Sequence, residues 1–261
     1  SPLILRDGSV ATVQTAGPED RDRVREFFHG LSPASRYRRF VALGEAPAEV
    51  VDRLCAKPDA RQGVTLLAVR SADHEPQLLG MASYLRVSDT AAEITFAVAD
   101  RSGHAGIATG LLERLAAIAS DAGFSSFRAT TMTDSAEMLG VFRDSGFMIR
   151  SKLAGTTVDV ELSLTPSARS VAACEAREHT ATIASVRPLL QPKAVAVVGV
   201  SRKPGSLGRR VFDLMIGAGY EGPIYPVNPR ADRIAGRTAY RSVREPPRGI
   251  DLAVIAVPRD A

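Results

Sequence analysis

Apolar and polar residues alternate along this chain in two different periods, which divide it into short strand-like runs and longer helix-like stripes. Runs rich in β-branched and aromatic residues predict strands, and apolar residues repeated every three or four positions predict helices. In the first part of the chain the predicted strands are 10–15, 64–69, 78–85, 92–98 and 124–130, with a hairpin at 147–152 and 157–164. The predicted helices there are 18–31, 34–43, 47–56, 106–122 and 135–145. This order, an antiparallel meander with helices before and after it, predicts an α+β domain.

The pattern changes after the predicted hairpin. Residues 165–186 are small, polar or charged and show no strand period, which indicates a linker helix or a tether. The continuous apolar run Ala194–Val200 is typical of a central parallel strand, and a Gly-rich turn follows it. A helix at 207–218 and strands at 224–227 and 252–257 complete the β-loop-α-β order of a Rossmann-like module.

The predicted domains are therefore 1–164 and 188–261, with a linker at 165–187. The second domain is an α/β module with too few residues for a six-stranded sheet, so we expect it to be partial.

Composition narrows the classes of function. The 33 Lys and Arg residues are scattered among 29 Asp and Glu residues, giving a net charge of only +4, and Trp is absent, so we expect no nucleic-acid partner. Cys55 and Cys174 lie far apart and there are only four His, so neither a disulfide framework nor a metal site is expected. The longest apolar runs are too short to span a bilayer and no targeting segment is visible, which predicts a cytoplasmic protein without a membrane partner.

A Gly-rich loop at 103–109 lies between a predicted strand and a predicted helix. Glycines at 103 and 106 allow backbone N–H groups to approach an anion closely, and the helix adds its positive N-terminal dipole. Pyrophosphate is the ligand that suits such a loop, although a plain strand-to-helix turn has the same pattern. The candidate binding residues of this loop are Gly103, His104, Ala105, Gly106, Ile107, Ala108 and Thr109.

With this loop in place, residues 10–164 resemble the GNAT N-acyltransferase family. The family loop reads Gln/Arg-x-x-Gly-x-Gly/Ala; Gly106 and Ala108 match it, whereas Gly103 stands where Gln or Arg is usual. The resemblance implies a GNAT fold, with a mixed, mostly antiparallel sheet and flanking helices. It also implies acetyl-CoA as the acyl donor, with no metal.

Glu93 is the candidate catalytic base. An amine must lose a proton before it attacks a thioester, and a lysine amine has a pKa of about 10.4, so a general base assists the step. Glu93 lies in the otherwise apolar or neutral strand Ala92–Val98, where a carboxylate can be buried and accept a proton near neutral pH. The alternative is that Glu93 faces solvent or pairs with an arginine. Backbone N–H groups of Phe96, Ala97 and Val98 would polarise the thioester carbonyl.

The helix predicted at 135–145 carries a second family pattern, Asn-x-x-Ala-x-x-x-Tyr-x-x-x-Gly-Phe, whose tyrosine often protonates the departing thiolate. Here the pattern reads Ser135, Met138, Phe142 and Gly146-Phe147, so the tyrosine is absent. Because a thiol has a pKa of about 8.5 and leaves readily as thiolate, no specific acid is expected. Ser135, Met138 and Phe142 remain candidate donor-binding residues, the last two equally suited to core packing.

The second module resembles the CoA-binding domain of NDP-forming acyl-CoA synthetases in three segments, 194–208, 225–229 and 251–258. An NAD site is less favoured because the compact Gly-x-Gly-x-x-Gly spacing is missing. By this resemblance the residues around CoA or a nucleotide would be Gly199, Ser201, Gly205, Ser206, Gly208, Asn228, Val257 and Pro258.

The combination of a GNAT domain with such a module resembles the bacterial Pat-type protein lysine acetyltransferases. The resemblance implies Nε-lysine acetylation by direct attack on the thioester, with an AMP-forming acyl-CoA synthetase as the protein substrate. Two alternatives stay open: a CoA- or acyl-CoA-sensing protein or synthetase subunit without transferase activity, and an N-acetyltransferase of small amines.

Overall fold

The computed structural model describes residues 1–35, 47–72, 75–102, 105–133 and 135–257, which form two compact units, Ser1–Thr182 and Ile183–Ala261. Most of the predicted helix at 34–43 and the predicted site residues Gly103, His104 and Pro258 lie outside the described residues. Within the described ranges, no helix has the length and apolar character needed to cross a membrane.

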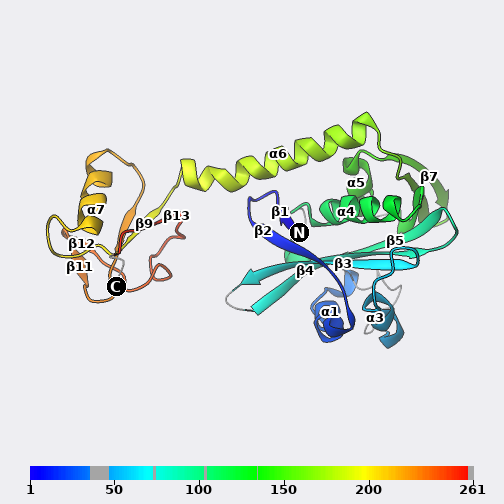
Figure 1. The fold of residues 1–261 in the computed structure, drawn as a ribbon, viewed down its shortest axis with the longest axis horizontal. Helices are drawn as coiled ribbons and strands as arrows, with labels where there is room; N and C mark the ends of the chain where they lie inside the picture. The colour runs from blue at the N-terminus through cyan, green and yellow to red at the C-terminus, as the bar shows by residue number, and fades with distance from the viewer. Residues whose placement is uncertain (36–46, 73–74, 103–104, 134, 258–261) are drawn as a thin grey trace. The chain divides into compact units, whose positions relative to one another are not determined.

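An eight-stranded sheet forms the centre of the first unit (Figure 1). Its strand order is β1-β2-β3-β4-β5-β6-β8-β7, and every neighbouring pair is antiparallel except β5 and β6. The strands are β1 (Pro2–Ile4), β2 (Val10–Thr15), β3 (Gly63–Ala72), β4 (Glu75–Arg86), β5 (Ala91–Val98), β6 (Ser126–Met132), β7 (Met148–Ala154) and β8 (Thr157–Ser163). The predicted meander and closing hairpin are confirmed, whereas β1 has no counterpart among the predicted strands.

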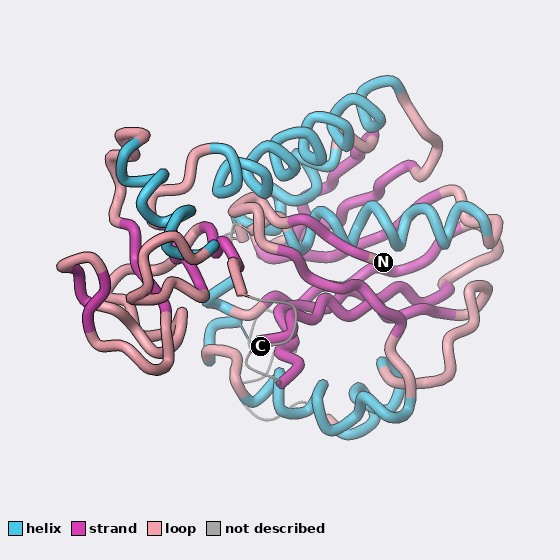
Figure 2. Tube along the Cα trace, turned by 60° about the vertical axis from the view of Figure 1, so that its left-hand side comes forward, coloured by secondary structure: helices cyan, strands magenta, loops and turns pink. Residues whose placement is uncertain are grey.

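Helices cover both faces of this sheet, as the cyan and magenta segments of Figure 2 show. The helical segments are η1 (Pro18–Asp20), α1 (Arg21–His29), α3 (Ala48–Leu54), η2 (Asp100–Ser102), α4 (Ile107–Asp121), α5 (Ala136–Ser145) and α6 (Ala168–Leu190). α1 and α3 lie on one face, and α4 and α5 lie on the other (Figure 1). The predicted amphipathic helix at 106–122 is α4, which ends just before Gly123, where φ is +96°.

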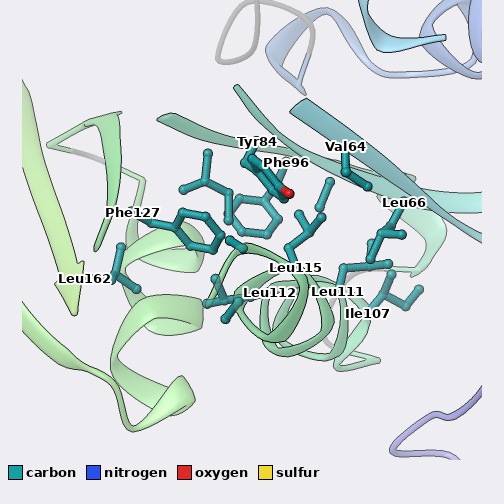
Figure 3. Packing of buried hydrophobic residues seen from close by; sticks show 14 of the residues in the cluster. Val64, Leu66, Tyr84, Phe96, Ile107, Leu111, Leu112, Leu115, Phe127 and Leu162 are labelled. Carbon is teal, nitrogen blue, oxygen red and sulfur yellow. The ribbon is translucent and has the colours of Figure 1, made fainter. Parts of the chain in front are cut away.

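The side chains of β5 alternate between two separate hydrophobic cores. Ile94 and Phe96 point to the α4 face and join the larger core, in which Leu111, Leu112 and Leu115 of α4 pack (Figure 3). Ala97 points to the opposite face and packs with the buried residues of α1 and α3. Successive side chains of a strand lie on opposite faces, so one strand serves both layers.

The predicted linker is largely helical. α6 begins at Ala168 and continues through Pro188 to Leu190, beyond the predicted start of the second domain. Pro188 lies in the last turn of the helix, where the missing N–H removes a single intrahelical hydrogen bond.

The second unit contains a three-stranded parallel sheet of order β10-β9-β13. Its elements are β9 (Val195–Val198), α7 (Leu207–Gly217), β10 (Ile224–Val227), β11 (Arg233–Ile234), β12 (Arg237–Thr238) and β13 (Leu252–Ile255). Phe212 of α7 and Val197 of β9 are fully buried in one core. The predicted Rossmann-like β-loop-α-β order is confirmed.

Candidate functional site

The sheet of the first unit opens between β5 and β6. These two strands pair for only three positions, of which Glu93 and Arg128 are the last. β6 then continues along β8, and β5 continues along β4 as far as Val98 paired with Gly80. The backbone groups of 94–98 that point away from β4 therefore face a gap rather than a neighbouring strand.

A cavity of about 540 Å³ lies at this gap. Its walls come from β5 at 94–98, β6 at 129–131, the start of α4 at 106–109 and the helix α5. The structure thus brings together most of the predicted donor-binding residues: Phe96, Ala97, Val98, Gly106, Ile107, Ala108, Thr109, Ser135, Met138 and Phe142. A volume of this size is typical of pockets that take a small organic ligand.

The start of α4 supplies one polar part of the cavity. Gly106 has φ +83°, a left-handed conformation that favours glycine, and its carbonyl accepts the first helical hydrogen bond from the Gly110 N–H at 3.0 Å. The N–H groups of the first helical turn have no acceptor within a helix, and the helix dipole makes this end positive. Ile107 and Thr109, both buried, line the cavity at this helix end.

Ala105 does not line the cavity, and its backbone joins the loop to another part of the sheet. Its carbonyl accepts a hydrogen bond of 3.1 Å from the Arg6 N–H, in the turn between β1 and β2. This bond holds the described part of the loop against the N-terminal hairpin.

The α5 wall is mostly apolar. Phe142 is buried and meets Phe96 of β5 edge to face, and Met138 packs against the same core. Ser135 is the residue that precedes α5, and it is buried at the rim of the cavity. Phe142 stands at the position of the family's tyrosine. Its ring packs against Phe96 in the cavity wall and has no hydroxyl group that could donate a proton.

Glu93 lies beside the cavity rather than in it. It occupies the last position at which β5 and β6 pair, and Ile94 next to it is the first cavity residue of β5. The expectation of a buried carboxylate is wrong, because the strand alternation places Glu93 on the Ala97 face, where it is exposed. Glu93 faces solvent, as the alternative prediction states.

Three charged cavity residues, Arg6, Glu137 and Asp144, were not predicted. Arg6 reaches the cavity from the β1–β2 turn, and Asp144 reaches it from the last turn of α5. The Nη2 atom of Arg6 and the Oδ2 atom of Asp144 lie 3.6 Å apart. Nothing in the local sequence marks either residue, because each is brought to the loop only by the packing of the whole domain.

The predicted residues of the second unit that the structure describes also lie close together, at the carboxyl ends of its parallel strands. Gly208, at the start of α7, approaches Gly199 so closely that an added Cβ would lie 2.3 Å from the Gly199 carbonyl oxygen. Asn228 Nδ2 donates to the Val200 carbonyl at 2.7 Å. The other predicted residues there are Ser201 and Ser206, whose hydroxyls are hydrogen-bonded at 2.8 Å, Gly205 with φ +83°, and Val257 beside Gly199. This edge is where open α/β sheets bind ligands.

Known proteins match the two units separately. Residues 32–147 match the acetyltransferase (GNAT) family model, and residues 193–261 match the CoA binding domain model. The GNAT domain of PAT from S. lividans superposes with a TM-score of 0.57 and 27% identity, over 62% of this chain and 96% of that domain. An acetyltransferase of Pseudomonas aeruginosa is 30% identical over 122 residues, which are 46% of this chain and 65% of that protein.

The second unit is similar to segments of ADP-forming ligases. The alpha subunit of acetate–CoA ligase I from Pyrococcus furiosus is 47% identical over 78 residues, which are 28% of this chain and 17% of the subunit. The ADP-forming acetate–CoA ligase II of Archaeoglobus fulgidus is 42% identical over 84 residues, 32% of this chain and 12% of the ligase. The chain therefore spans only a small part of these relatives.

Proposed function

Because this chain carries an acetyltransferase domain of the GNAT family at 32–147 and a CoA-binding domain at 193–261, we propose that it transfers an acetyl group from acetyl-CoA to the Nε of a protein lysine. The observation that carries the proposal is the cavity at the β5–β6 gap, which combines an exposed strand edge, the start of α4 and an apolar α5 wall. Acyl transfer needs these three features, for the carbonyl, the phosphates and the pantetheine chain of the donor respectively.

Glu93 acts as the general base in this proposal. Its carboxylate takes a proton from the lysine ammonium, directly or through one water, and the neutral amine then attacks the thioester carbonyl. Exposure suits this role because a protein lysine must approach Glu93 from solvent. Its position at the closed end of the gap places it next to the cavity segment that begins at Ile94.

The strand edge stabilises the charge that develops on the carbonyl oxygen. Backbone N–H groups around Phe96–Val98 that point into the gap donate to this oxygen, as in an oxyanion hole. The N–C bond then forms, and the attacking nitrogen, which now carries an extra proton, gives that proton to water. The C–S bond breaks, and its electron pair leaves with sulfur as thiolate. Phe142 donates no proton, so solvent protonates the thiolate.

We further propose that the substrate is an AMP-forming acyl-CoA synthetase. The support is the resemblance of the two-domain arrangement to Pat-type protein lysine acetyltransferases. The second unit, which is similar to CoA-binding segments of ligases, would bind CoA or dock the substrate through the residues around Gly199 and Gly208.

The test is to incubate the full chain with labelled acetyl-CoA and a purified AMP-forming acyl-CoA synthetase, and to locate the label by peptide mass spectrometry. Glu93→Gln should lower kcat/KM by about 100-fold or more at pH 7. The deficit should shrink as the pH approaches the lysine pKa of about 10.4, because the amine then needs no base. Glu161→Gln is the matched control: it removes a strand carboxylate that also pairs in register with Arg128 but lies outside the cavity lining.

Two results would contradict the proposal. Equal labelling by wild type and Glu93→Gln at every pH would remove the proposed base. Absence of label on the synthetase, with binding of acetyl-CoA intact, would favour a CoA-sensing protein; label on small amines alone would favour a small-molecule acetyltransferase.

A further inference from the structure

The side chain of Arg6 lies across the start of α4. An added Cβ on Gly106 would lie 3.5 Å from Arg6 Cγ and 3.6 Å from Arg6 Nε, so the stem of the arginine covers this glycine. The backbone N–H of Arg6 also donates to the Ala105 carbonyl. Two independent contacts therefore fix Arg6 at the point where the positive end of α4 meets the cavity, and its side chain lines that cavity.

The guanidinium of Arg6 forms a weak, solvent-exposed ion pair. Its partner Asp144 lies 3.6 Å away, and the two side chains are 51% and 54% exposed. An ion pair of this kind contributes little to stability, so exchange of the Asp144 carboxylate for another anion costs little free energy. Arg6 is thus a guanidinium held beside an anion-binding helix end, with a partner that it can release.

A second arginine keeps this arrangement in place. Arg177 of α6 donates to the carbonyl of Asp144 and to the carboxylate of Glu113 on α4. Burial, followed by the nearby charge of Arg6, lowers the pKa of Arg177. Arg177 therefore binds Glu113 and the end of α5, and among the described residues Arg6 is the cation that lines the cavity at the start of α4.

The loop itself lacks the cation or amide that its family pattern carries. Position 103 is Gly where Gln or Arg is usual, so this position has no side chain that could bind a phosphate. We propose that Arg6 supplies the missing phosphate-binding side chain and that Asp144 holds it over Gly106 until the donor binds. This inference rests on the proposed function, in that the phosphates are those of acyl-CoA.

The test measures binding to this cavity without relying on activity. In the full chain, protection of α4 and α5 peptides from hydrogen exchange is followed against CoA concentration, and then against pantetheine, which has no phosphates. Arg6→Gln, which keeps the stem over Gly106, should raise the half-saturating CoA concentration about tenfold, as expected for one charge-assisted hydrogen bond. It should leave the pantetheine curve unchanged, and Asp144→Asn should lower the CoA concentration needed.

Arg21→Gln is the matched control, because Arg21 forms a similarly exposed ion pair with Asp52 away from the cavity lining. It should leave both curves unchanged. An unaltered CoA curve for Arg6→Gln, or an equal shift for CoA and pantetheine, would overturn the proposal. Protection by CoA without any acetyl transfer would instead contradict the proposed function and leave the role of Arg6 intact.

Discussion

The rings of Phe96 and Phe142 meet edge to face, with centroids 6.2 Å apart and planes inclined by 63°. Phe96 belongs to β5 and Phe142 to α5, so this contact joins two walls of the cavity. The sheet cannot join β5 to its neighbour here, because the pairing of β5 with β6 ends at Glu93. The ring contact therefore joins β5 to α5 beyond the point at which β5 and β6 stop pairing.

Truncation of Phe142 should destabilise the first unit strongly. Phe142 is only 2% exposed, and Phe→Ala changes at buried positions cost about 3–5 kcal/mol in the free energy of unfolding. Phe142→Ala should therefore lower the urea midpoint, measured by circular dichroism, and raise the KM for acetyl-CoA. Met148→Ala, on the edge strand β7 where Met148 is 64% exposed, should change stability by less than about 0.5 kcal/mol. Similar midpoints for the two variants would show that the ring contact does not hold the cavity walls.

The carboxylate of Asp100 should make stability depend on pH in the acid range. Burial acts to raise the pKa of Asp100, but hydrogen bonds from Ser35 and Ser32 outweigh it, so the pKa lies below the ordinary value of 3.8. Asp100 Oδ1 accepts from the Ser35 hydroxyl at 2.6 Å and Oδ2 from the Ser32 N–H at 2.8 Å, which fastens the segment after α1 to the end of β5.

Because the folded pKa is depressed, the stabilisation by Asp100 is present above pH 3.8 and is lost as the pH falls through the folded pKa. Asp100→Asn should be less stable than wild type at pH 7, by less than about 1 kcal/mol because the group is exposed. The difference, measured from urea midpoints between pH 7 and the lowest pH at which the protein still folds, should disappear at the acid end. A difference that stays constant across this range would contradict the assignment.

Gly208 should be essential to the second unit. A Cβ at this position would lie 2.3 Å from the carbonyl oxygen of Gly199, a backbone atom that cannot move aside cheaply. Gly208→Ala should therefore cost about 1–3 kcal/mol through overpacking and increase hydrogen exchange in α7. Gly217→Ala, at the other end of α7 with no atom within 4 Å of the added Cβ, should be neutral or stabilising. Equal exchange rates in the two variants would argue against the close approach of α7 to β9.

Much of the fold was predictable because its signals are local. The helix α4 and the loop before it follow from the apolar period over 106–122 and from glycine at 106, where φ is positive. The parallel strand β9 follows from the apolar run at 194–200, since a strand buried on both faces needs no polar alternation. The gathering of Phe96, Phe142 and the loop at one site came from the resemblance to GNAT acyltransferases.

The sequence by itself determined the elements, their order and the chemical character of the loop, because periodicity and backbone freedom are properties of neighbouring residues. Only the tertiary structure decided that β5 and β6 separate after Glu93, that Glu93 is exposed, and that Arg6 lies over Gly106. Each of these depends on strand pairing or packing between segments far apart in the chain. Such contacts depend on the free energy of the whole domain, so they cannot be predicted from any single stretch of the sequence.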